Sequence, residues 1–285
     1  MTSRDFSKAI ESHVRMIDQS LIRRQAMKHE KALKILTASL AMGSFLIELG
    51  IPSPLAFPPV AQGSQSQNDF SELDELIRLN PQDPEAWLNR GGSKFRRGNY
   101  TGAIEDVDQA IRLDPDSDLA FQFRGYINYT NGNYNEAMED YDQAVRLNPN
   151  SVSVHLLRAE LRRYLGNDHE ALEDYNQMIR LDPVNSYAYR MRSYTNYDLG
   201  NYDEAIEDIN QAIQLDPELF RNRYTISVRG VYKYMLGNYR EAIEDFDQAI
   251  QLDPDASTAY YHRGLARLKL ENNRLLLRTL NKLPN

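Results

Sequence analysis

The sequence predicts an all-α fold, built as a solenoid of tandem helix hairpins. A segment that begins with Gly-Asn and ends with Pro occurs five times, at residues 98–115, 132–149, 166–183, 200–217 and 237–254. The first three steps between the terminal prolines are 34 residues long, and the fourth is 37. Within a copy, Ala137, Tyr141 and Ala144 recur at helical spacing and form one apolar face. Self-similarity at this period indicates stacked supersecondary units.

The amino-acid composition argues against several classes of function. The 285-residue chain has no Cys, which excludes disulfides and thiolate metal sites, and its formal net charge is −8. An acidic repeat region argues against nucleic-acid binding, which needs a basic surface to displace counterions. Basic residues are concentrated in residues 1–34.

The N-terminal extension, residues 1–61, has the order of an export signal. Basic residues lead into an apolar core at 35–51, and a Pro-rich segment with small residues follows. A start at Met27 instead of Met1 would give an ordinary basic head. The pattern predicts either a cleaved signal peptide or an uncleaved signal-anchor. Both place the repeats outside the cytoplasm, in the periplasm, in the thylakoid lumen or in the medium. A membrane contact is expected only through this segment.

Residues 62–68 are small and polar and predict a linker. Residues 69–83 follow, and the stretch from Phe70 to Pro81 (FSELDELIRLNP) reads as the second helix of a repeat without its first. We therefore expect an N-terminal capping helix there.

One complete repeat, 118–151, explains the others. Gly132 and Asn133 tolerate the positive φ that ends the first helix. Glu136 suits the positive end of the second helix, and Pro149 stops it. Gly125 in the first helix lets the two helices approach closely.

Length 34, an aromatic at position 4, a small residue at 8, Gly-x-Tyr, Ala at 20 and 27, and Pro at 32 resemble the tetratricopeptide repeat (TPR). The Arg-Gly and Glu-Asp-Tyr-x-Gln-Ala motifs are most similar to those of cyanobacterial TPR proteins. The resemblance implies a right-handed superhelix with a concave groove that binds peptide segments of partners. It divides the chain into five units, 84–117, 118–151, 152–185, 186–222 and 223–256.

Residues 257–285 open a partial sixth unit. Glu271 replaces the turn Gly and Leu276 replaces the small Ala, so we expect the tail to form a C-terminal capping helix. The three extra residues of the 37-residue step fall between Glu218 and Tyr224 and predict a tolerated insertion.

Position 7 is Arg in every unit and position 11 is always polar, which gives each first helix a basic-polar pair. These pairs are candidates for partner binding through Arg124, Asn128, Arg158, Arg162, Arg192, Asn196, Arg229 and Lys233. A ladder of this kind would hold carboxylates or another anionic polymer. The alternative is a structural pairing with an Asp in each second helix, namely Asp106, Asp140, Asp174, Asp208 and Asp245.

Aromatic side chains supply a second set of candidates. The resemblance places on the groove Phe123, Tyr126, Tyr164, Tyr187, Tyr194 and Tyr224. Tyr presents a flat apolar face and a hydroxyl, which suit extended peptides or sugars. The aromatics at position 12, such as Tyr129, can belong to the core instead. The chaperone-tail clamp known in this family needs Lys and Asn where Leu88, Gly92 and Phe123 stand, so that ligand is not implied.

Nothing in the sequence predicts catalysis, a cofactor or a metal site, and His155 occupies the aromatic slot at position 4 as a core substitute. We therefore expect a non-catalytic, exported scaffold that binds a protein or peptide. The alternatives are an envelope-glycan or anionic-polymer binding module and an assembly factor for a membrane complex.

Overall fold

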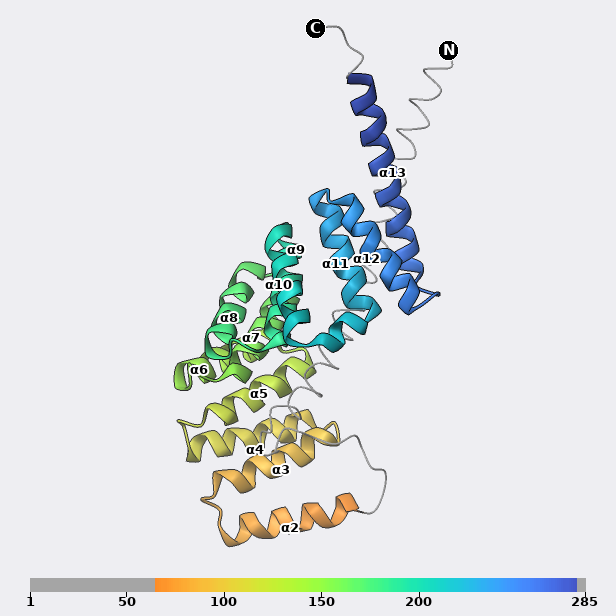
Figure 1. Ribbon diagram of the computed structural model, residues 1–285. Coiled ribbons are helices and arrows are strands. Elements are labelled where there is room, and N and C mark those ends of the chain that lie inside the picture. Colours follow the sequence, from red (N-terminus) through yellow and green to blue (C-terminus); the bar gives the residue numbers. More distant parts are fainter. Residues whose placement is uncertain (1–64, 281–285) are drawn as a thin grey trace, which may run out of the picture. The chain divides into compact units, whose positions relative to one another are not determined.

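The computed structural model describes the backbone of residues 65–280 and the side chains of residues 71–274 (Figure 1). The predicted all-α fold of tandem hairpins is confirmed: the described residues form α-helices and one short 3-10 helix. No helix among them is long and apolar enough to cross a bilayer. The apolar core predicted at 35–51 lies outside the described residues.

The helices alternate between first and second members of a hairpin. Their bounds are α2 Gln65–Leu79, α3 Pro84–Arg96, α4 Tyr100–Leu113, α5 Asp118–Asn131, α6 Tyr134–Leu147, α7 Val152–Leu165, α8 Asp168–Leu181, α9 Ser186–Asp198, α10 Tyr202–Leu215, α11 Arg223–Leu236, α12 Tyr239–Leu252 and α13 Ser257–Leu280.

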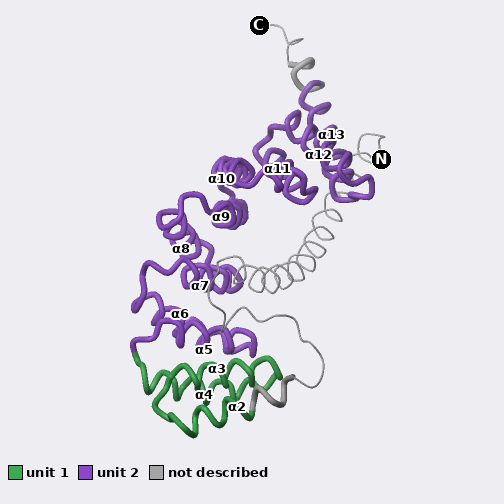
Figure 2. The backbone as a smooth tube through the Cα atoms, turned by 60° about the horizontal axis from the view of Figure 1, so that its bottom comes forward, with its two compact units in different colours: residues 1–115 green, residues 116–285 purple. Residues whose placement is uncertain are grey.

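The chain divides into two compact units, residues 1–115 and 116–285 (Figure 2). The described part of the first unit is the α3/α4 hairpin with α2 packed on α3. Ile77 is the buried apolar side chain of α2, and Asp74 on the same helix accepts a hydrogen bond from Arg90 on α3. Thus α2 occupies the place of a second helix, as its sequence predicts.

The second unit holds four complete hairpins, α5/α6, α7/α8, α9/α10 and α11/α12, and ends with α13 packed on α12. The predicted apolar face of each second helix is buried. In α6, Ala137 and Ala144 are fully buried and Tyr141 is 1% exposed.

Two glycine positions build the hairpin, as the sequence predicts. The turn glycines have φ between 75° and 93°, a left-handed conformation that L side chains rarely adopt. The helix glycine allows close packing: a Cβ on Gly125 would lie 2.7 Å from the ring of Tyr141.

The connector that holds the three extra residues contains η1, the five-residue 3-10 helix Pro217–Arg221, between α10 and α11. Leu219 is buried there, whereas Phe220 is exposed and lies beneath the guanidinium of Arg229. The insertion is therefore taken up within one tight turn, and α11 begins in the same register as the other first helices.

The end of the second unit differs from a complete repeat. The sixth first helix does not turn at position 15, which is Glu271, but continues as α13 through Leu280, beyond the helices it packs on (Figure 1). The first helix of the partial sixth unit and part of the expected capping helix thus form one continuous helix.

Candidate binding surface

The arginines at position 7 bind a carboxylate sixteen residues further along the chain. In each complete repeat the Nη2 atom donates to an Asp oxygen across 2.5 to 2.7 Å. The pairs are Arg90–Asp106, Arg124–Asp140, Arg158–Asp174, Arg192–Asp208 and Arg229–Asp245. These carboxylates are buried, which makes the pair part of the hairpin interior.

The polar residue at position 11 contacts the same Asp. Lys94, Arg162 and Lys233 form ion pairs at 2.7 to 2.8 Å, and Asn128 and Asn196 donate hydrogen bonds at 3.2 and 3.0 Å. Two side chains of the first helix therefore satisfy one buried carboxylate of the second.

Asp174 in the third repeat has the largest set of donors. Burial opposes its ionisation, but hydrogen bonds from His155 and Arg158 and the charge of Arg162 outweigh that effect and lower its pKa below the usual value. His155 is buried, with Nδ1 2.9 Å from Asp174 and Nε2 2.9 Å from the carbonyl oxygen of Pro149. The sequence interpretation of His155 as a core residue is confirmed.

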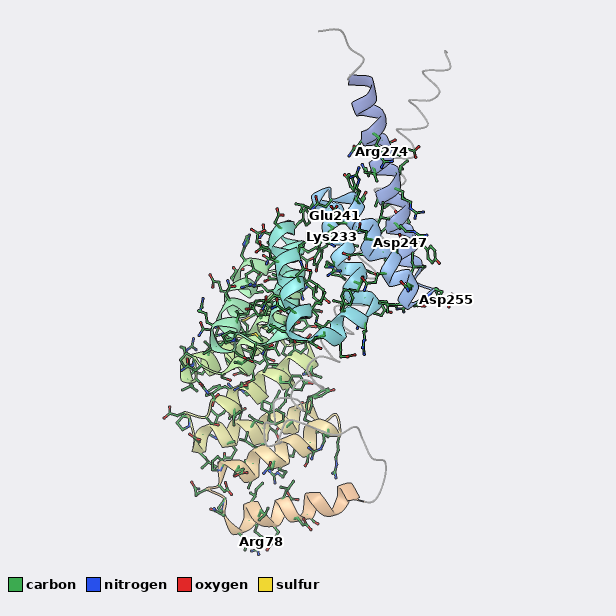
Figure 3. The ribbon with its side chains drawn as sticks, viewed as in Figure 1. Arg78, Lys233, Glu241, Asp247, Asp255 and Arg274 are labelled. Carbon is green, nitrogen blue, oxygen red and sulfur yellow. The ribbon has the colours of Figure 1, made fainter. Side chains whose placement is uncertain are left out.

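The Nη1 atom of these arginines reaches back to the preceding repeat. It donates to the residue at position 25 in the second helix of that repeat. The distance is 2.6 to 3.2 Å for Arg90, Arg158, Arg192 and Arg229. Such pairs are Arg90–Asp74, Arg158–Asp142, Arg192–Asn176, Arg229–Asn210 and Arg263–Asp247, the last with Asp247 labelled in Figure 3. We call an Arg with its carboxylate at position 23 and its acceptor at position 25 of the preceding repeat a clasp.

The geometry favours the structural interpretation of the Arg column. The donors of Arg124, Arg158, Arg192 and Arg229 already hold carboxylates within the repeat array. A direct role of these side chains in binding a partner stays a prediction. Sequence reasoning found the partner at position 23 but missed position 25, since that contact joins two different repeats.

The aromatic at position 12 packs on the Tyr that follows Gly-Asn in its own repeat. Ring centroids are 5.5 to 5.8 Å apart in the pairs Phe95–Tyr100, Tyr129–Tyr134, Tyr197–Tyr202 and Tyr234–Tyr239. This set therefore holds the two helices of the hairpin together near their turn.

One of these pairs extends into a cluster. Tyr164 of α7 lies 4.8 Å from Tyr134 and 6.2 Å from Tyr129 between ring centroids, and the Tyr134 hydroxyl donates to the Tyr164 hydroxyl at 3.0 Å. Tyr164 is 38% exposed. Burial raises the pKa of Tyr129 to about 12. We call these three residues the tyrosine cluster. The rings of Tyr129 and Tyr134 pack against the ring of Tyr164, and that ring is exposed to solvent.

The other predicted aromatics differ in exposure. Phe123 is only 4% exposed, Tyr126, Tyr187 and Tyr194 are half-buried, and Tyr224 is 63% exposed. Burial raises the pKa of Tyr187 and of Tyr194. Tyr164 and Tyr224 are consequently the candidates that present most surface.

The third repeat carries charges where the others carry aromatics, a feature that sequence reasoning missed. Arg163 stands at position 12 and donates to Asp198 of α9 across 3.2 Å. Glu160, one turn earlier, accepts a hydrogen bond from the buried Tyr175 hydroxyl at 2.8 Å. The missing position-12 aromatic and the Asp168 in place of the turn Tyr were the available signal.

Comparison with family models settles the family. The model described as tetratricopeptide repeat matches residues 71–118, 93–152 and 156–219, and one described as TPR repeat matches residues 233–270. The chain belongs to the tetratricopeptide repeat family. No curated protein sequence matches it.

Several solved structures have the same fold. YrrB, described as a TPR protein with an unusual peptide-binding site, is 20% identical with a TM-score of 0.60, and the match covers 67% of this chain and 97% of YrrB. MamA from Desulfovibrio magneticus RS-1 is 17% identical with a TM-score of 0.55, covering 61% and 96%. The APC/C hetero-tetramer Cut9–Hcn1 is 17% identical with a TM-score of 0.50, covering 72% of this chain and 40% of that one. At these identities the likeness shows the fold alone.

Proposed function

We propose that this TPR protein is a non-catalytic scaffold that holds an extended segment of a partner protein against the first helices of its second unit. The tyrosine cluster carries the proposal. Tyr164 offers an exposed ring, held in place by Tyr129 and Tyr134. A ring that is already positioned loses little side-chain entropy on binding, and its hydroxyl can bond a peptide carbonyl.

Two further observations support a protein partner. TPR proteins generally serve as protein interaction modules, and YrrB, which shares the fold, is described by its peptide-binding site. The exposed apolar side chains of the same first helices, Leu119, Tyr164, Tyr224 and Met235, suit an extended segment with apolar side chains.

The anionic-polymer alternative is favoured less, because it requires the Arg column. Those guanidinium groups hold buried carboxylates, and a polymer would have to displace these partners. Salt-dependent retention on an anionic polymer, lost on neutralising Arg124 while stability is kept, would favour this alternative.

The test is a binding screen of the full chain against an array of extended peptides. We expect Tyr164→Ala to weaken the strongest interaction about tenfold, since one aromatic anchor contributes on the order of 1 to 2 kcal/mol. Tyr261→Ala is the matched control, because Tyr261 is similarly exposed but lies on α13. Equal binding by wild type and Tyr164→Ala would contradict the proposal.

We also propose that the repeats act outside the cytoplasm. The order of residues 1–61, basic, then apolar at 35–51, then Pro-rich, supports this location. Sequencing the N-terminus of the mature protein tests both cleavage and the start at Met1 or Met27. A partner that is a membrane-complex subunit would make the protein an assembly factor. The similarity of the repeat motifs of this chain to those of cyanobacterial TPR proteins stays a prediction.

A further inference from the structure

The last first helix, α13, lacks a second helix of its own. Three of the five complete repeats have Gly at position 8, and a Cβ on Gly91, Gly125 or Gly230 would lie only 3.2, 2.7 or 2.8 Å from the second helix. Gly264 is the equivalent residue of α13, and a Cβ there would meet no atom of the described residues within 4 Å. Gly264 would therefore allow a second helix to pack closely on α13, but none of the described helices lies on this face.

The clasp of α13 is half-filled. Arg263, at position 7, contacts Asp247 at position 25 of the preceding repeat, as Arg158 and Arg192 contact their residues at that position. In a complete repeat the Nε and Nη2 atoms of the equivalent Arg also donate to a carboxylate at position 23, as Arg90 does to Asp106. Among the described residues, Asp247 is the only carboxylate within ion-pair distance of Arg263 or of Arg267 at position 11. Within the described part of the chain, the Nε and Nη2 side of Arg263 therefore has no carboxylate partner at position 23.

The chain does not fill this site with its own next residues. Position 23 of the sixth unit would be Thr279, and the backbone remains in the single helix α13 through Leu280. A hairpin would require a turn near Glu271, where the helix continues.

The helix α2 shows the opposite arrangement, because it is a second helix and no first helix of its own is found among the described residues. Its register is fixed by Asp74, which occupies position 25 and binds Arg90. That register places Glu72 at position 23 and Leu76 at position 27. In the complete repeats these positions are buried, whereas in α2 Glu72 is exposed and Leu76 is 53% exposed.

We propose that α2 of one copy docks on α13 of another, so that two chains together form one complete repeat. Glu72 would supply the missing carboxylate to Arg263 and Arg267, and Leu73 and Leu76 would cover the open face at Gly264. The net charges are complementary. In α2, Asp69, Glu72, Asp74 and Glu75 outnumber Arg78, and in the described part of α13, Arg263, Arg267, Lys269 and Arg274 outnumber Glu271. This inference goes beyond the proposed function and does not depend on it.

The contact joins two different surfaces and is heterologous. Each added copy exposes a fresh α2 or α13, so association continues beyond a dimer as open chains, unless the rotation between copies closes a ring. The interface residues of α2 depart from a complete repeat at three positions. Glu72 replaces the Asp at position 23, Leu76 stands at position 27 where the repeats carry Ala or Met, and Asp69 stands at position 20 where every repeat carries Ala. Asp69→Ala is therefore expected to tighten the association.

The first experiment measures the mass of the full chain by sedimentation equilibrium over a range of concentrations. We expect the wild-type mass to rise past a dimer, and both Gly264→Leu and Glu72→Arg to stay monomeric. A one-to-one mixture of the two variants should form dimers and stop there, because it contains one intact α2 and one intact α13. Wild type that stays monomeric at every concentration overturns the proposal.

Matched controls separate docking from other causes. Asn273→Leu adds the same side chain to α13 about 180° around the helix from Gly264, at an exposed position without charge, and Glu105→Arg makes the same charge change on α4. Both should associate as wild type does. Association that persists in Gly264→Leu, for example through residues 35–51, overturns the proposal. Arg263→Glu gives an independent reading if Gly264→Leu fails to fold.

The second experiment uses the absence of Cys from the chain. A Cβ added at Gly91 or Gly125 would lie 3.4 or 3.1 Å from the Cβ of the Asp at position 23 of the same repeat, which is near disulfide geometry. The double variant Glu72→Cys/Gly264→Cys should therefore give a ladder of disulfide-linked chains on oxidation. Each single variant can give no more than a dimer, and a double variant without a ladder overturns the proposal.

Discussion

Arg158 and Asp174 lie sixteen residues apart and meet within the third repeat, where Nη2 of Arg158 donates to Oδ1 of Asp174 across 2.7 Å. The same guanidinium donates through Nη1 to Asp142 of the preceding repeat at 2.8 Å. One side chain thus closes its own hairpin and fixes that hairpin to its neighbour. Arg suits this position because its planar fork offers several donors in a fixed geometry.

Asp174→Ala is expected to destabilise the protein by about 3 to 5 kcal/mol, because Arg158, Arg162 and His155 would keep no carboxylate partner in the interior. Asp142→Ala, at the more exposed end of the clasp, should cost about 0 to 1 kcal/mol. Urea unfolding followed by circular dichroism measures both. Similar losses for the two variants would mean that the buried half of the clasp is not the stronger one.

The stability of the protein should fall at acid pH. The pKa of Asp174 is lower in the folded than in the unfolded chain, where it is about 4, so its contribution is complete above that value. The contribution is lost as the pH falls from the unfolded toward the folded pKa. Asp174→Asn should flatten this part of the curve of unfolding free energy against pH. An unchanged slope would show that other carboxylates cause the acid sensitivity.

Gly125→Ala should destabilise the second repeat by about 1 to 3 kcal/mol, because the added Cβ would lie 2.7 Å from the Tyr141 ring. Gly264→Ala makes the same change in an open position and should stabilise a dilute, monomeric sample by about 0.5 to 1 kcal/mol through helix propensity. Thermal unfolding distinguishes the two signs. A destabilising Gly264→Ala would imply that the face of α13 is already covered in the monomer.

Gly132→Ala should cost about 1 to 2 kcal/mol although its Cβ would meet nothing, because the backbone there has φ of 86°. Gly132→Asn should cost less, since Asn tolerates this conformation better. The comparison is made by chemical denaturation. Equal costs for Ala and Asn would place the penalty somewhere other than backbone conformation.

Much of the fold follows from features that lie within one repeat. Gly132, Gly125 and Pro149 each act on their immediate neighbours, and the sequence therefore predicts the turn, the close helix crossing and the stop. The pairing of Arg124 with Asp140 could also be proposed from the sequence, because both belong to one hairpin and recur together.

What the sequence could not supply depends on contacts between repeats. Asp142 gives no sign within its own helix that it binds Arg158, and Tyr164 joins Tyr134 only once two hairpins are stacked. Phe123 occupies a position that the family directs to the groove, yet its neighbours leave it 4% exposed. Exposure is set by the side chains on both sides of a helix, which a single repeat does not contain.

The 3-10 turn Pro217–Arg221 has a practical consequence. Three additional residues leave the link between Arg229 and Asn210 in place, so side-chain contacts, and not the length of the connector, set the phase of the next hairpin. The connector is therefore the natural place to graft a reporter peptide or a fluorescent tag into this array.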